Sequence, residues 1–461
     1  MSSLTTTKTQ LVESSVVGGS RMNKIVIVKR ESSIGQRQTV LLFGFAFFWL
    51  LDTFYVTILL PVYGSYFVDL DVSLAKKLTL SVLAALPALW LPLRIDRPSK
   101  FALWGFYFVM YVPVSAVFPY MLNEPFPKIV AWICAYACCM ATLQFLCSSP
   151  PFKIPRAHLA GPAYWSILLF LLSAAVIAIG LQVGFRWEFT AFSDVYELRD
   201  MASTQHNRLS SYLYGLLANG LNTVVVIRAI QSRNIFWIAV SFGSSVFAYS
   251  IEGGKHSLFL PILAFVAYVL LSRKHRYHSV LIAFFFLASS FIAFIAESLW
   301  EGKFNFSLFL LRRVFIIPAS VSAKYIEFFS ENPFTYMGDG LLRYFVKYPY
   351  EVSTPELIAN NYFGVGSSAN TGYIASSFSQ FGFLGIILST LIVGFLLRTL
   401  DSVCKGLETK LGAAFSSVMI LVLSNTQVTV GLLTHGVGLM LILAYAYPRE
   451  RRPASDISQL S

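Results

Sequence analysis

Two adjacent arginines, Arg312 and Arg313, lie in the middle of an otherwise apolar stretch that runs from Phe304 to Pro318. An arginine at the centre of a membrane span costs about 2.5–3.5 kcal/mol, whereas a Leu, Ile or Phe gains only about 0.3–0.6 kcal/mol. The two arginines would therefore cancel most of the free energy that the apolar neighbours gain on insertion into the membrane. We therefore expect the stretch to lie at, or dip into, the outer membrane interface without crossing. Guanidinium groups in such a place require an anionic partner.

Proton acceptors gather in a second polar segment, 185–209. Around the cation Arg199 this segment holds four groups that can take a proton from a hydroxyl: Asp194, Glu197, Asp200 and His206. One interpretation is a catalytic loop in which a cation meets phosphate and one neighbour acts as a base. The alternative is a solvated loop with surface ion pairs, which composition alone favours.

A short turn from Glu252 to His256 contains two glycines followed by Lys255. Glycine lets the backbone approach a ligand closely, so Lys255 is a candidate phosphate contact. Tight hairpins between membrane helices use glycine simply to turn, and both interpretations stay open. The spacing differs from that of a P-loop and no strand precedes it, which excludes a Walker-type site.

The segment 297–380 is the one long polar-rich stretch between apolar segments. Residues 319–332 predict a short amphipathic helix with Tyr325 on its apolar stripe, and such a helix can lie on the membrane surface. Asn370 and Tyr373 follow near the end of the segment. Aromatic faces stack on sugar rings and amide groups bond hydroxyls, so we predict sugar contacts for Tyr325, Asn370 and Tyr373.

The elements that must position these groups are membrane helices, because 56% of the 461 residues are hydrophobic and only 13% are charged. The apolar pattern predicts an all-α polytopic membrane protein with twelve spans, near 39–61, 78–93, 101–119, 129–147, 162–184, 210–227, 235–251, 257–272, 280–297, 381–397, 412–427 and 433–447. We predict one transmembrane domain, 39–447, between a disordered cytoplasmic tail, 1–38, and a second cytoplasmic tail, 448–461. The first tail has no cleavable signal.

The placement of basic residues gives the orientation. The chain has 35 Lys and Arg against 23 Asp and Glu, a net charge of +12. With both termini in the cytoplasm, the inner side, tails included, holds most of the basic residues and the outer side most of the acidic ones, as the positive-inside rule requires. A further crossing at 304–321 would turn basic inner loops outward. The segments 185–209 and 297–380 then face the periplasm.

The remaining polar groups have structural alternatives. The five cysteines fall in spans or inner loops, so we expect packing roles and no disulfides. Asp52, inside an apolar span, either bonds a neighbouring helix, which we favour, or is the coupling acid of a carrier. His435 is either a packing residue, again favoured, or a proton acceptor near the outer interface. Gly382 and Gly385 are expected to serve helix packing.

Several of these segments, taken in order over about 190–395, resemble the oligosaccharide repeat-unit polymerases (O-antigen polymerases, Wzy type). The segments that carry the resemblance are Tyr196–Arg199, the GGKHS turn that contains Lys255, Arg312–Ala319 with Tyr325 and Phe328–Phe329 downstream, Ala369–Gly372, and Phe381–Gly385. These motifs follow one another in the order, and at the outer positions, that the family has. The spacing of the loop arginines varies in that family, which leaves open which member of the pair contacts phosphate.

The resemblance implies a glycosyltransferase of the bacterial inner (cytoplasmic) membrane, with its active site facing the periplasm. It would join polyprenyl-diphosphate-linked oligosaccharides, such as undecaprenyl diphosphate derivatives, into O-antigen of lipopolysaccharide, capsule or exopolysaccharide. The enzyme would need no metal and no cofactor. Its expected partners are the membrane lipid and the flippase and chain-length regulator of the same pathway, with no nucleic acid. In this scheme Arg199, Arg312, Arg313 and Lys255 bind the diphosphate.

Two other classes of protein remain as alternatives. A secondary transporter or a flippase for lipid-linked sugar can also have twelve spans, although embedded charges are few and the halves do not repeat. A ligase that moves finished polysaccharide onto a lipid core shares the same chemistry, and the sequence separates it poorly from a polymerase.

Overall fold

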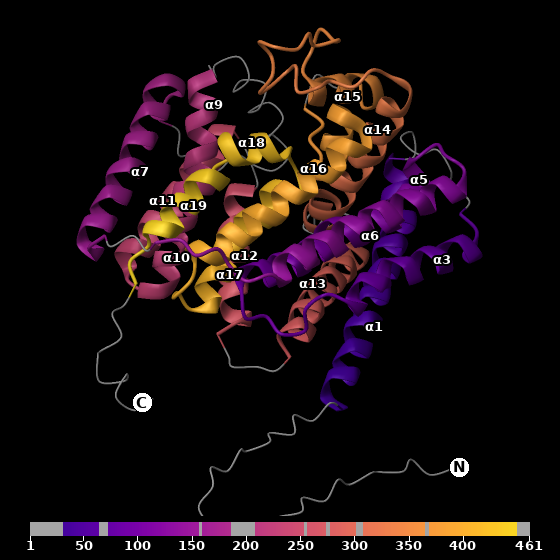
Figure 1. Ribbon diagram of the computed structural model, residues 1–461, viewed down its shortest axis with the longest axis horizontal. Helices are drawn as coiled ribbons and strands as arrows, with labels where there is room; N and C mark the ends of the chain where they lie inside the picture. The colour runs from indigo at the N-terminus through magenta and orange to yellow at the C-terminus, as the bar shows by residue number, and fades with distance from the viewer. Residues whose placement is uncertain are drawn as a thin grey trace, which may run out of the picture.

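A computed structural model describes residues 31–63, 72–155, 159–185, 208–252, 256–272, 277–300, 308–364 and 368–449, and every regular element there is helical (Figure 1). The first elements are α1 (Glu31–Phe54), η1 (Tyr55–Leu59), α2 (Leu60–Tyr63), α3 (Leu74–Ala85), η3 (Leu86–Leu89), α4 (Pro98–Phe106), η4 (Tyr107–Tyr111), α5 (Val112–Met121), α6 (Phe126–Ser148) and α7 (Gly161–Val183). The middle elements are α9 (Arg208–Gly215), η5 (Leu216–Leu221), α10 (Asn222–Ser232), α11 (Ile235–Glu252), α12 (His256–Leu270) and α13 (His278–Trp300). The last are η6 (Leu308–Ile316), α14 (Ile317–Glu331), α15 (Thr354–Tyr362), α16 (Tyr373–Val403), α17 (Thr409–Leu423), α18 (Val428–Leu433) and α19 (Val437–Ala446).

The helices have the length and hydropathy of a polytopic membrane protein. Within the described residues, seven are long and apolar enough to cross a membrane: Ser33–Leu59, Pro98–Met121, Phe126–Ser148, Gly161–Val183, Leu209–Ser232, His278–Leu299 and Tyr373–Val403. Four shorter apolar helices are Ile235–Ile251, Phe259–Leu270, Thr409–Leu423 and Val437–Ala446. Every stretch predicted as a span coincides with one of these helices or, for 78–93, with α3 and η3.

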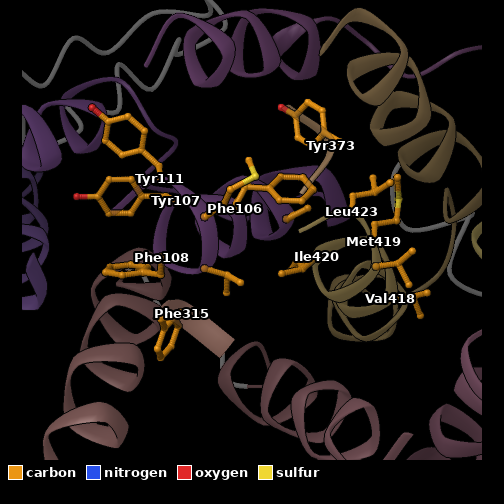
Figure 2. Close-up of a cluster of buried hydrophobic side chains, with 14 of the residues drawn as sticks. Phe106, Tyr107, Phe108, Tyr111, Phe315, Tyr373, Val418, Met419, Ile420 and Leu423 are labelled. Atoms are coloured by element: carbon orange, nitrogen blue, oxygen red, sulfur yellow. The ribbon is translucent and has the colours of Figure 1, made fainter. Parts of the chain in front are cut away.

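The helix Pro98–Met121, formed by α4, η4 and α5, is buried throughout and lies at the centre of the bundle. Figure 2 shows its aromatic side chains between two groups of helices. Phe108 stacks on Phe286 of α13 at 5.0 Å, and it meets Phe47 of α1 at 5.3 Å. Phe47 in turn contacts Phe315 of η6 at 5.3 Å. The segment that contains the paired arginines is therefore anchored to the middle of the bundle.

Arginines hold the helix ends along one edge of the bundle. Arg37 of α1 donates to the carbonyl oxygens of Ala88 and Leu91, at 2.8 and 2.5 Å. Carbonyls at the C-terminal end of a helix lack intrahelical donors, and a guanidinium satisfies them well. Three further arginines do the same at other helix ends: Arg97, Arg398 and Arg449. All four belong to regions for which the sequence predicts an inner position, and α1 begins at the lower edge in Figure 1.

Helix α16 is kinked where the sequence prediction began a span. Phe381 (φ −140°, ψ 22°) and Gly382 (φ +59°, ψ −142°) leave the helical conformation. The carbonyls of Ser379 and Gln380 accept hydrogen bonds from the backbone N–H groups of Thr335 and Tyr336, at 2.9 and 3.1 Å. The chain is helical from Tyr373, and the kink divides it into two helices close to the predicted start of the span at 381.

The kink also corrects the role expected of two glycines. Gly382 lies at φ +59°, a region that side chains disfavour, and a Cβ there would come 3.0 Å from the ring of Phe334. At Gly385 a Cβ would come 2.1 Å from the carbonyl oxygen of Ser377, in the preceding turns of the same helix. Both glycines therefore allow α16 to bend, rather than allowing two helices to pack closely.

We expect Gly382→Ala to destabilise the fold by about 2 kcal/mol, because the residue would keep a strained conformation or break the kink. The measurement is the unfolding midpoint of the purified protein in mixed micelles. Gly243→Ala in α11 is the matched control, because a Cβ at that position meets nothing within 4 Å. Equal midpoints for the two variants would contradict this role for the kink.

Candidate functional site

The paired arginines lie on a helix that is packed into the bundle. The π-helical segment η6 continues into α14 without a break, because Ile316 between them is itself helical (φ −78°, ψ −50°). Arg312 and Arg313 are half-buried, and each interacts with other residues of the chain. Their neighbours Leu311 and Phe315 are buried in the core. Wide π-helical turns occur frequently at functional sites, where they re-aim side chains.

Helix α14 forms where the amphipathic helix was predicted, but other helices cover its apolar stripe, so the stripe is not free to lie on a membrane surface. It packs against α5 and α16, and the residues from Pro318 to Ile326 are all buried. The expected apolar stripe, Val321, Tyr325 and Phe329, is buried. The small residues beside it are buried as well, because neighbouring helices cover both faces. Small residues permit such close helix packing, and they do not mark a solvated face.

Two segments of the family resemblance meet at Thr371. The hydroxyl groups of Thr371 and Ser322 lie 2.6 Å apart, and Ser322 donates to the carbonyl of Pro318 at 2.7 Å. This contact joins the helix that follows the arginines to the segment 369–372. Gly372 fits closely beside the end of α17, since a Cβ there would come 2.9 Å from the carbonyl oxygen of Ser424.

The three predicted sugar contacts differ in accessibility. Asn370 is exposed beside Thr371. Tyr325 and Tyr373 are buried, with 2% and 0% of their surfaces exposed. Figure 2 shows Tyr373 within the buried cluster, and its ring lies 6.2 Å from that of Phe106. Stacking of a sugar on either tyrosine would require the surrounding helices to separate. Their sugar-binding role stays a prediction.

The sequence analysis missed a buried lysine in the middle of α14. Lys324 is 6% exposed, its Nζ lies 3.0 Å from Oε2 of Glu327, and it sits 5.1 Å from the ring centre of Tyr362 in α15. Burial and the nearby carboxylates of Glu327 and Glu331 raise the pKa of Tyr362. In sequence, Lys324 and Glu327 look like any solvated i,i+3 pair, so no signal distinguished them.

The distance along the helix separates this ion pair from the arginines. Glu327 follows Arg313 by fourteen residues, which corresponds to roughly 20 Å at about 1.5 Å per residue. A general base must lie within hydrogen-bond reach of the proton that it removes. Glu327 therefore cannot serve as the base for a bond whose leaving phosphate is held by Arg313. Instead, the ion pair holds Lys324 within α14, and the contact of Lys324 with the ring of Tyr362 ties α14 to α15.

The other predicted site residues lie outside the described residues. They are the four proton acceptors, Asp194, Glu197, Asp200 and His206, and the two further cations, Arg199 and Lys255. Within the described residues, no cluster of three or more His, Cys, Asp or Glu side chains has the geometry for a metal ion.

Asp52 bonds neighbouring helices, as the favoured interpretation predicted. Its carboxylate lies 3.0 Å from Nζ of Lys77 in α3 and accepts a hydrogen bond of 2.5 Å from the hydroxyl of Tyr120 in α5. Lys77 also lies 5.5 Å from the centre of the Tyr120 ring. Asp52 is 3% exposed. Its charge is compensated inside the bundle, which is the arrangement that makes a buried carboxylate tolerable.

An apolar cavity of about 190 Å³ opens between α6 and α16, next to the kink. Its lining includes Ala135, Cys138, Phe383 and Thr390. Ligand sites are usually larger than about 300 Å³ and have several convergent polar groups. This cavity has neither property, so it is not the site of sugar chemistry. Cys138 and Cys134 are exposed on α6, and all five cysteines are free.

Comparison of the chain with protein-family models, curated proteins and solved structures returned no match.

Proposed function

We propose that this protein is a glycosyltransferase that polymerises polyprenyl-diphosphate-linked oligosaccharides into a surface polysaccharide. The observation that carries the proposal is the position of Arg312 and Arg313 on a helix embedded among apolar helices. Such a place suits a ligand whose anionic group stays at membrane level while its lipid remains in the bilayer. The Ser322–Thr371 contact, which joins this helix to exposed Asn370, also supports it.

The chemistry requires one proton acceptor and one strong anion site. A hydroxyl of the incoming lipid-linked repeat attacks the anomeric carbon of the growing chain, and the bond from that carbon to the diphosphate oxygen breaks. The hydroxyl proton passes to a base, for which Asp194, Glu197, Asp200 and His206 remain the candidates. The polyprenyl diphosphate leaves with the bonding electrons. Arg312 and Arg313, with Arg199 and Lys255, would stabilise its growing negative charge.

In this proposal the chain crosses the bacterial inner membrane twelve times, with both termini in the cytoplasm and the active site facing the periplasm. The edge of the bundle where Arg37, Arg97 and Arg398 bind helix ends supports this orientation, because basic residues concentrate on the cytoplasmic side of membrane proteins.

We expect a cysteine at Ser330 to react with a membrane-impermeant maleimide added to intact spheroplasts, and a cysteine at Lys405 to react only after lysis. Both positions are exposed. The background is a cysteine-free variant, so that Cys134 and Cys138 do not contribute. Labelling of Lys405→Cys in intact spheroplasts would overturn the orientation.

Reconstitution of the purified protein with short lipid-linked repeat units tests the function directly. A ladder of longer products on a gel is the expected result, and EDTA should leave the ladder intact. Movement of intact lipid-linked sugar between leaflets without a ladder would instead identify a flippase. Transfer of a finished polysaccharide to a lipid core, without chain growth, would identify a ligase.

A further inference from the structure

The guanidinium of Arg228, near the end of α10, lies between two tryptophans from neighbouring helices. Its carbon Cζ is 4.4 Å from the ring centre of Trp165 in α7 and 5.9 Å from that of Trp237 in α11. The two indole rings are 5.3 Å apart. The ring of Tyr447 closes the group from another side, 5.4 Å from Trp165. Three helices and the end of α19 therefore converge on one cation.

Arg228 lacks the backbone carbonyl partners that the four arginines at the helix ends have. Arg37, Arg97, Arg398 and Arg449 each donate to backbone carbonyls. Arg228 makes no hydrogen bond and no ion pair with any residue that the structure describes, and its Nε is buried without a partner. A buried polar group without a partner usually costs about 1–3 kcal/mol. Cation–π contacts offset part of that cost, but they leave all five N–H donors unused.

The position of the group indicates which anion can reach it. Trp165 lies in the second turn of α7 and Trp237 in the first turn of α11, so both are at helix ends. Ile235 and Phe236, next to Trp237, are exposed, with 79% and 51% of their surfaces accessible. Exposed apolar side chains beside tryptophans and a cation are typical of the boundary between acyl chains and headgroups. The phosphate groups found at the boundary between acyl chains and headgroups belong to lipids.

We propose that Arg228, Trp165 and Trp237 form a binding site for the phosphate of an anionic phospholipid. The guanidinium donates to the phosphate oxygens, and the indole rings hold its plane and border the glycerol backbone. Basic pockets between membrane helices bind such headgroups on the cytoplasmic side. That is the side on which the sequence places the end of α10. The site is separate from Arg312 and Arg313 and does not depend on the proposed reaction.

Quenching of tryptophan fluorescence by brominated lipids tests the proposal. The protein is reconstituted into phosphatidylcholine vesicles in which a minority of the lipid is brominated, as either phosphatidylglycerol or phosphatidylcholine. We expect brominated phosphatidylglycerol to quench Trp165 and Trp237 with about fivefold higher affinity, the ratio that one cation contributes near a membrane surface. The signal of these two rings is isolated by subtracting that of a Trp165→Phe/Trp237→Phe variant.

Two variants and one competitor complete the experiment. Arg228→Gln should remove the preference, whereas Arg228→Lys should keep part of it. Arg233→Asn is the matched control: this exposed arginine lies five residues on, and asparagine tolerates its left-handed conformation (φ 51°). Equal quenching of the wild-type protein by the two brominated lipids would overturn the proposal whether or not any variant folds. Loss of the preference in the presence of inorganic phosphate would overturn the lipid assignment, because the site would then take a soluble anion.

Discussion

If the protein is the proposed polymerase, we expect Arg313→Ala to abolish the long-chain product, and we expect the same result for Arg312→Ala and Arg199→Ala. The leaving diphosphate gains negative charge in the transition state, and a positioned donor to such a group is worth about 10²–10³ in rate. Two adjacent guanidiniums cannot replace each other when they bind different oxygens, so each single change is costly. Arg313→Lys should restore part of the activity, because it keeps the charge but loses the bidentate geometry. The measurement is the gel ladder of the reconstituted protein.

The controls for this series separate chemistry from folding. Arg343→Ala removes an exposed arginine of the segment 297–380, whose guanidinium contacts the adjacent Tyr344, and should leave the ladder unchanged. Each variant must also keep the wild-type unfolding midpoint, since Leu311 and Phe315 anchor this segment in the core. Wild-type chain length in the triple variant would exclude a role for these arginines in holding phosphate.

Asp52→Ala is expected to cost about 3–5 kcal/mol of stability, because it leaves the ammonium of Lys77 without its partner inside the bundle. A buried ion pair can often be replaced as a unit by apolar residues at little cost. The free energy of unfolding of the double variant Asp52→Leu/Lys77→Met should therefore lie within about 1 kcal/mol of the wild-type value. Both values come from denaturant titration in mixed micelles.

A further variant, Asp52→Asn, distinguishes the proposed function from the transporter alternative. Asp52 accepts a hydrogen bond from Tyr120 and pairs with Lys77, which is a structural arrangement. Asp52→Asn should therefore keep the product ladder. A loss of less than about 1 kcal/mol in Asp52→Ala would mean that water already compensates the lysine, against the burial of this pair.

Hydropathy located the helices well, because a bilayer demands long apolar segments with internal hydrogen bonds. Hydropathy did not predict backbone conformation where contacts with residues distant in the sequence determine it. The kink at Phe381 and Gly382 depends on donors from Thr335 and Tyr336, some forty residues earlier. No local pattern around 381 carries that information.

The candidate site was predicted in a similarly uneven way. The arginine pair was evident, because two charges in an apolar stretch need a reason. The burial of α14 was not, since its apolar stripe looks the same whether lipid or neighbouring helices cover it. Lys324 shows the limit most clearly: only the position of Tyr362 in α15 distinguishes a buried lysine from a surface one.

The arginine at position 449 has a consequence for biogenesis. Its guanidinium donates to the carbonyls of Val403 and Lys405, at 2.5 and 3.2 Å, and to those of Tyr445 and Tyr447, both at 3.0 Å. During synthesis, the C-terminal end of α16 therefore waits for more than forty further residues to leave the ribosome before its carbonyls find this donor. Until then these carbonyls lack their donor, so a residue that follows α19 completes the end of α16.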